Sequence, residues 1–134
     1  MTTTIQIRDW QRFRRDGEQF IKTAVRAHLK RKKGFNHDAL YNLTCMGVEK
    51  LIMALIMKNG DLAENHTMVD LLIAMENHLG HSAAIAEKME YLSSFQEICD
   101  LETYTTRQPS SNEVDKIVEI GQEIHTYLSS HLYR

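Results

Sequence analysis

The chain has 134 residues, of which 43% are hydrophobic and 25% charged, a composition that fits one soluble globular domain with a buried core. The net charge of −2 hides an asymmetry along the chain. Residues 1–35 carry ten Lys or Arg and three Asp or Glu, whereas residues 36–134 carry six Lys or Arg and fifteen Asp or Glu. The longest apolar run, 51–57, is too short to span a bilayer and no secretory leader is recognisable, so we expect a cytoplasmic protein without membrane association.

The first predicted helix, 8–33, has an apolar face and a basic face on opposite sides. Aromatic and aliphatic residues recur on one side at three- and four-residue spacing. The other side carries a basic stripe that could follow the phosphates of a nucleic acid: Arg8, Arg12, Arg15, Lys22, Arg26, Lys30 and Lys33. The alternatives are a solvated helix face, or a face against acidic neighbours within the monomer or across a dimer. The stripe contains no aromatic residues, so it does not predict stacking of single-stranded bases.

The second predicted helix, 38–58, opens with Asn36 or Asp38 and is apolar nearly all round. A helix of this kind packs on several sides, so we expect it at the centre of the fold. Gly47 would permit a close approach of another helix. Glu49 is a carboxylate near the core and needs a partner or an exposed edge, as a structural ion pair, a dimer contact, or an acid or base.

Three more helices are predicted after the second. Thr67 and Asp70 resemble a capping box that opens a helix to about residue 79, and His66 just before it is expected to fix the loop by a hydrogen bond. A fourth helix is predicted over 82–101 and a last one over 110–132. No strand pattern is recognised. The sequence therefore predicts a single all-α domain over 1–134, an antiparallel up-and-down bundle of four or five helices.

The loop before the last helix is the strongest candidate for a functional surface. Arg107 is the only basic residue between Lys88 and Lys116, and the only proline of the chain follows two residues later. An arginine guanidinium binds phosphate or carboxylate in a fork. The candidate residues for binding a ligand or a partner are Arg107, Tyr104 and Asn112.

The residues give little support for metal binding, a phosphate-binding loop or a cysteine nucleophile. The seven histidines are scattered and no Glu-x-x-His pairs recur, so we predict neither a metal site nor a cofactor. No glycine-rich phosphate loop is present. Cys45 and Cys99 lie among apolar residues, which favours buried thiols over a disulfide or a nucleophile.

Three features follow one another along residues 38–132: the apolar helix with Glu49-Lys50, the helix start Asn65-His66-Thr67, and the Tyr104…Arg107…Pro109 loop. In this order they resemble the HEPN family (higher eukaryotes and prokaryotes nucleotide-binding domain), of the nucleotidyltransferase-associated type. The resemblance implies a helical bundle, commonly a homodimer, and often a toxin–antitoxin partnership with a minimal nucleotidyltransferase. Active ribonucleases of the family use an Arg followed after four to six residues by a His, paired across the dimer.

The chain departs from the ribonuclease pattern at that histidine. Positions 112–114 hold Asn, Glu and Val, the next histidine is His125, and Gln108 replaces the family's Tyr. We therefore expect a non-catalytic, dimeric module that binds nucleotide or RNA or a nucleotidyltransferase, with Arg107 as anchor and with Glu49 and His66 in support. One alternative is a metal-independent ribonuclease toxin, with His66 or His125 brought near Arg107. The other is a structural adaptor whose basic helix binds an acidic protein.

Overall fold

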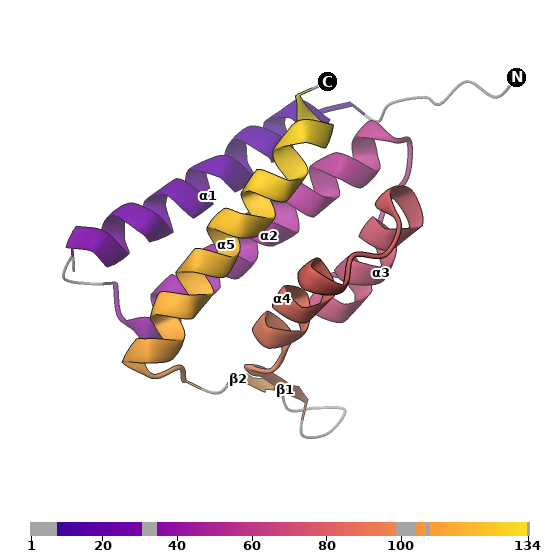
Figure 1. The fold of residues 1–134 in the computed structure, drawn as a ribbon. Helices are drawn as coiled ribbons and strands as arrows, with labels where there is room; N and C mark the ends of the chain where they lie inside the picture. Colours follow the sequence, from indigo (N-terminus) through magenta and orange to yellow (C-terminus); the bar gives the residue numbers. More distant parts are fainter. Residues whose placement is uncertain (1–7, 31–34, 99–103, 107, 134) are drawn as a thin grey trace, which may run out of the picture.

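The computed structural model describes residues 8–30, 35–98, 104–106 and 108–133, the last two residues of the second range and 104–106 by their backbone alone. These residues form a helical bundle with one short hairpin at its end (Figure 1). The helices are α1 (Trp10–Lys30), α2 (His37–Lys58), α3 (Met68–Leu79), α4 (Ala83–Ser93) and α5 (Ser111–Leu132), and the strands are β1 (Gln96–Ile98) and β2 (Tyr104–Thr106). The predicted all-α bundle is confirmed.

Side-chain caps explain where four of the helices begin. The Asn36 side chain accepts a hydrogen bond from the backbone N–H of Ala39 at 2.8 Å, which settles the start of α2. Thr67 caps α3 and Ser82 caps α4 in the same way. Ser110 and the side chain of the third helical residue of α5 form the complete capping box that the sequence predicts. The helix α1 instead begins after Asp9, whose φ of 71° lies in the left-handed region.

The central helix is α2, as its apolar composition predicts. Its side chains from Leu51 to Met57 are all buried, and Val48 is fully inaccessible. By length and composition α2 could cross a membrane, with a mean hydropathy of 1.4 over its best window, but 72% of that window is buried inside the bundle. Burial of this extent is what the core helix of a globular domain shows.

Helices α1 and α2 approach closely through two glycines, in agreement with the prediction for Gly47. A Cβ atom placed on Gly17 would lie 3.0 Å from the Gly47 carbonyl oxygen and 2.9 Å from Leu51 Cγ. Any larger side chain at Gly17 would therefore meet the backbone of α2. The contact sets α1 against α2 along the middle of both helices.

Consecutive helices run in opposite directions, except that α3 runs parallel to α2. Helix α1 is antiparallel to α2 and α5, because Trp10 at its start lies against Lys58 at the end of α2 and Arg14 bonds the carbonyl oxygen of Leu132 in the last turn of α5. Helix α4 is antiparallel to α5, since Lys88 pairs with Glu123, whereas Tyr91, further along α4, lies against Lys116, which comes earlier on α5.

The exception is α3, which runs parallel to α2. His66, before α3, bonds Glu49 in the middle of α2, and His78, near the end of α3, bonds Asp61 beyond the end of α2. The link 59–67 thus returns along α2 before α3 begins. The strict up-and-down alternation expected from the sequence is interrupted there.

The helix predicted over 82–101 ends at Ser93, and this is a correction. The hydroxyl of Ser94 donates to the Tyr91 carbonyl oxygen at 2.6 Å, and the next residue, Phe95, is fully buried. The chain then pairs as two antiparallel strands with Gln96 opposite Thr106. Burial of Phe95 against Tyr41 and Tyr91, with ring centroids 5.4 Å apart in both pairs, ends the helix, because the chain must turn to insert this ring.

Candidate functional site

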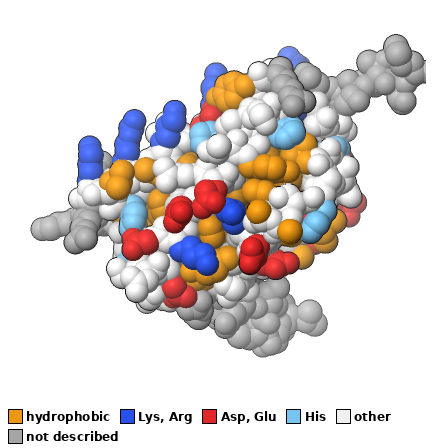
Figure 2. All heavy atoms as spheres, viewed as in Figure 1, with side chains coloured by type: hydrophobic (Ala, Val, Ile, Leu, Met, Phe, Trp, Pro, Cys, Tyr) orange, Lys and Arg blue, Asp and Glu red, His pale blue; other side chains and the backbone are white. Residues whose placement is uncertain are grey.

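Every described side chain of the basic stripe on and just before α1 is exposed. These six side chains are Arg8, Arg12, Arg15, Lys22, Arg26 and Lys30, whereas Lys33 lies outside the described residues. The core face of α1, which includes Gly17, Ile21 and Ala24, packs on the bundle and turns the stripe outward. Figure 2 shows Lys and Arg side chains standing in a row along the α1 edge. We call this surface the cationic stripe.

The cationic stripe has no partner among the described residues. None of its six side chains forms an ion pair, a hydrogen bond or a ring contact there. The sequence alternative in which acidic neighbours of the same monomer cover the stripe is therefore not what the described residues show. From Arg12 to Lys30 the stripe extends over about 27 Å, at 1.5 Å per residue.

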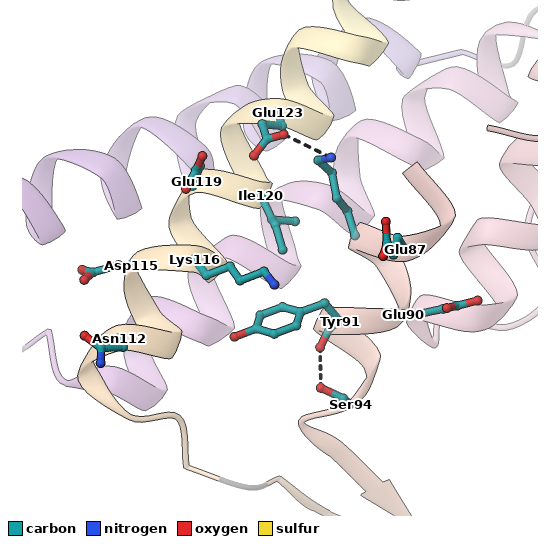
Figure 3. A pocket seen from close by; sticks show the side chains of 11 residues that line it. Glu87, Glu90, Tyr91, Ser94, Asn112, Asp115, Lys116, Glu119, Ile120 and Glu123 are labelled. Atoms are coloured by element: carbon teal, nitrogen blue, oxygen red, sulfur yellow. Dashed lines mark hydrogen bonds and ion pairs between the residues drawn. The ribbon is translucent and has the colours of Figure 1, made fainter. Parts of the chain in front are cut away.

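A groove of about 790 Å³ lies between α4 and α5 (Figure 3). The ring of Tyr91 reaches across it toward α5, where the Lys116 ammonium lies 4.3 Å from the ring centroid. Lys88 and Glu123 close one side with an ion pair at 3.1 Å. Five carboxylates and two lysines line this groove, so it favours cations over phosphate: Glu87, Glu90, Asp115, Glu119 and Glu123 with Lys88 and Lys116.

The predicted loop site is described only in part. Asn112 is exposed and lines the α4–α5 groove near the start of α5. Tyr104 lies in β2, where its backbone pairs with Ile98, but its side chain lies outside the described residues, as does the whole of Arg107. The grouping of these three residues around an anion stays a prediction.

Glu49 and His66 are brought together by the fold. The imidazole Nδ1 of His66 lies 3.0 Å from Glu49 Oε1, and both side chains remain partly exposed. The pair ties the link before α3 to the middle of α2. His66 thus makes the loop-fixing hydrogen bond that the sequence predicts, and Glu49 has the partner that it requires.

A cluster that the sequence does not reveal joins α1 to the end of α5. Glu18 accepts hydrogen bonds from His125 Nε2 at 2.8 Å and from the Tyr133 hydroxyl at 2.5 Å. The Arg14 guanidinium lies 4.3 Å from the centroid of the Tyr133 ring. We call these four residues the seam cluster. His125, one of the candidates for a ribonuclease, is held here.

The seam cluster changes the acidity of Glu18. Partial burial raises the pKa of this carboxyl, but the hydrogen bonds from Tyr133 and His125 and the positive charges of His125 and Arg14 lower it further than burial raises it. The net result is a lowered pKa. The carboxylate form is therefore the one that the fold stabilises.

A second cavity, of about 360 Å³, lies at the end of the bundle where α5 begins. His28 and His37 both line it, together with Ser111. His28 Nε2 lies 2.8 Å from Asp115 Oδ1, and His37 Nδ1 lies 3.0 Å from the carbonyl oxygen of Pro109. The two histidines are nine residues apart, one near the end of α1 and one at the start of α2, so sequence spacing alone gives no sign that they line the same cavity.

Histidines in this fold serve mainly to connect elements. Of the seven, all within the described residues, six have a ring nitrogen bonded to a carboxylate or a backbone carbonyl: His28, His37, His66, His78, His81 and His125. In the part of the chain that the structure describes, no three metal-binding side chains come together.

No protein-family model matches the chain, and neither a curated protein nor a solved structure matches it. Function is therefore inferred from three features: the cationic stripe, the α4–α5 groove, and the cavity that His28 and His37 line.

Proposed function

We propose that this chain is a non-catalytic helical module that binds RNA, without regard to sequence, through the cationic stripe of α1. The observation that carries the proposal is the row of six exposed cations with no partner in the described part of the chain. Neutralising phosphates with such a row releases condensed counterions, which favours binding. A linear array about 27 Å long suits a linear polyanion.

Two further observations support RNA of no particular sequence. The stripe has no aromatic side chain on which bases could stack, and backbone contacts alone carry little sequence information.

The HEPN resemblance supports a cytoplasmic module that binds RNA or nucleotide and acts as a homodimer or beside a nucleotidyltransferase. In that setting Arg107, Tyr104 and Asn112 would form a second contact, for an anion or a partner carboxylate.

Salt dependence of RNA binding tests the proposal. Fluorescence anisotropy with a labelled single-stranded RNA should give a log–log salt slope near −4 if six phosphates are contacted, at about −0.7 each. The variant Arg12→Ala/Arg15→Ala should reduce the steepness by about 1.4. The matched control, Lys88→Ala/Lys116→Ala, removes two cations from the α4–α5 groove and should leave the slope unchanged.

Two outcomes would contradict RNA binding. Either the wild-type affinity is insensitive to salt, or the groove control weakens binding as much as the stripe variant does. Preferential binding of polyglutamate over RNA would instead favour the adaptor alternative, in which the basic helix meets an acidic protein.

A metal-independent ribonuclease is the second candidate function, and the cavity at the start of α5 is the observation that favours it. His28 and His37 line this cavity beside Ser111, and His37 is bonded to the carbonyl oxygen of Pro109. His66 and His125 are less suitable because of where they lie: His66 is bonded to Glu49, about 18 Å along α2 from His37, and His125 lies about 20 Å along α5 from Asn112.

One of the imidazoles of His28 and His37 could accept the proton of a 2′-hydroxyl as it attacks the adjacent phosphate, and the other could donate a proton to the 5′-oxygen that leaves when its bond to phosphorus breaks. Incubation of excess protein with RNA, followed by electrophoresis, tests this. Cleavage that His37→Asn abolishes, with the helical circular dichroism unchanged, would support the ribonuclease. Intact RNA after prolonged incubation with the wild type would exclude it.

A further inference from the structure

A depression of about 260 Å³ lies between α1 and α5, at the edge of the cationic stripe. Lys22 and Arg26 of the stripe line it from α1, and Gln122, His125 and Thr126 line it from α5. None of the described residues that line it is Asp or Glu, in contrast to the α4–α5 groove. The depression therefore continues the positive surface of α1 toward α5.

The contact between Glu18 and His125 sets the two walls of the depression at the same level. Helices α1 and α5 run antiparallel (Figure 1), so Lys22, one turn after Glu18, lies across from Gln122, about one turn before His125. Arg26 follows Lys22 by a further turn, about 6 Å along α1. A ligand in the depression would therefore lie between two cations on one side and the polar side chains of α5 on the other.

The polar groups around the depression are available to a ligand. The side chains of Lys22, Arg26 and Gln122 are exposed and have no partner in the part of the chain that the structure describes. The Thr126 hydroxyl donates its proton to the backbone carbonyl oxygen of Gln122 at 3.0 Å, which leaves the hydroxyl oxygen as an acceptor. Helix α5 therefore offers a donor, the Gln122 amide, and an acceptor, the Thr126 oxygen, one turn apart.

The charges around the depression decide which part of a ligand faces which helix. Further round α5, Glu119 and Glu123 line a neighbouring depression that shares Gln122 and Thr126. These carboxylates repel a phosphate, whereas the two cations of α1 attract it. The α1 wall therefore suits phosphate, and the α5 wall suits a neutral group that carries a hydroxyl.

We propose that this depression binds one ribose of the RNA strand and recognises its 2′-hydroxyl, an inference that rests on the proposed function. The 2′-hydroxyl accepts a hydrogen bond from the Gln122 amide and donates one to the Thr126 oxygen. Lys22 and Arg26 bind the phosphates on either side of this sugar. A 2′-hydroxyl is the group by which a protein distinguishes RNA from DNA, so the ribose site makes the chain prefer RNA.

The size and the apolar lining of the depression suit a single sugar. Pockets that enclose a whole small molecule typically hold about 300–1,000 Å³, so a volume of about 260 Å³ is small for a complete nucleotide. Ile21 and Val25 line the depression with aliphatic side chains, against which the carbon atoms of the sugar ring pack. The base stays outside, which agrees with binding that disregards sequence.

Strands that differ only at the 2′ position test the ribose site. Fluorescence anisotropy compares a labelled oligouridine with an oligodeoxyuridine of the same length. The wild type should bind the RNA strand about fivefold more tightly, the gain from about one net hydrogen bond. A 2′-fluoro strand keeps the sugar pucker of RNA but has no hydroxyl to donate, so it should bind like the deoxy strand. This comparison separates recognition of the hydroxyl from recognition of strand shape.

Variants of the α5 wall separate sugar contacts from phosphate contacts. Gln122→Ala/Thr126→Val changes two exposed side chains and should leave the helical circular dichroism unchanged. It should bind the RNA strand as weakly as the deoxy strand and keep the wild-type salt slope, because no cation is lost. Arg12→Ala/Arg15→Ala should weaken binding of both strands and keep the preference for RNA. The matched control Gln11→Ala, an exposed position of α1 outside the depression, should leave both affinities unchanged.

Three results would overturn the ribose site and leave the proposed function standing. The first is salt-dependent binding of the RNA and deoxy strands with equal affinity. The second is a folded Gln122→Ala/Thr126→Val variant that keeps the preference for RNA. The third is a 2′-fluoro strand that binds as tightly as RNA, which would assign the preference to strand shape. Failure to bind either strand would instead refute the proposed function, and the ribose site with it.

Discussion

Substitution of Gly17 by alanine has two effects of opposite sign on the free energy of unfolding. It raises the helix propensity of α1, and it adds a Cβ atom at the tight contact with α2. A Cβ atom at this position would lie 2.9 Å from Leu51 Cγ and 3.0 Å from two backbone atoms, the Gly47 oxygen and the Leu51 nitrogen. A side chain could rotate away, but backbone cannot. Relief of the two backbone contacts therefore requires α1 and α2 to move apart.

The balance of these effects can be estimated. Alanine is favoured over glycine inside a helix by about 1 kcal/mol. Overpacking a tight core costs typically about 1–3 kcal/mol, and a contact relieved only by moving a helix belongs near the upper end of this range. We therefore expect Gly17→Ala to lower the free energy of unfolding by about 1–2 kcal/mol. The midpoint of thermal unfolding should fall by about 3–10 °C.

Urea unfolding followed by circular dichroism measures this change. The control is Gln19→Ala, an exposed position two residues further on the same helix, which should stay within about 0.5 kcal/mol of the wild type. If Gly17→Ala raises the free energy of unfolding by about 1 kcal/mol, propensity alone is acting. The close approach of α1 and α2 would then be refuted.

Three further predictions concern the side chains of Glu18, Cys45 and Tyr41, which are paired or buried. Because the folded pKa of Glu18 is lowered, its stabilising contribution is present above the unfolded value of about 4.3 and is lost as the pH falls through the folded pKa. Urea titrations on acidification should therefore lose stability more steeply in the wild type than in Glu18→Gln; parallel curves would contradict this. Burial raises the pKa of the Cys45 thiol to about 12, so in a Cys99→Ser background a thiol reagent should modify it only as fast as the protein opens, not at the rate of a free thiol. Tyr41→Phe removes the 2.7 Å hydrogen bond from the Tyr41 hydroxyl to the Leu92 carbonyl oxygen, which also accepts from the Phe95 N–H at 3.4 Å. The free energy of unfolding in urea should fall by about 0.5–1.5 kcal/mol, and an unchanged value would mean that the hydrogen bond makes no net contribution.

The features predictable from sequence are those that depend on neighbours along the chain. Caps act over three residues, so Thr67 and Ser110 mark their helices correctly. The apolar composition of α2 identifies the central helix, and four-residue periodicity identifies the exposed face that carries the cationic stripe. These signals need no knowledge of the tertiary fold.

Other features depend on contacts that the sequence does not announce. The direction of α3 is set by His66–Glu49 and His78–Asp61, each pair 17 residues apart. The seam cluster joins residues more than 100 positions apart, such as Glu18 and His125. Strands of three residues are too short to show an alternating pattern, so the sequence predicts β1 as the end of a helix and β2 as part of a loop.

The antiparallel course of α1 against α5 has a practical consequence for attaching other molecules. Arg14 bonds the Leu132 carbonyl and Glu18 bonds Tyr133, so the described chain begins and ends at one pole of the bundle (Figure 1). The opposite pole holds Pro109 and the start of α5. A fluorophore, affinity tag or fused domain at either terminus would therefore emerge at the far end from the cavity of His28 and His37. Probes placed at the termini can report on binding there without occupying the cavity themselves.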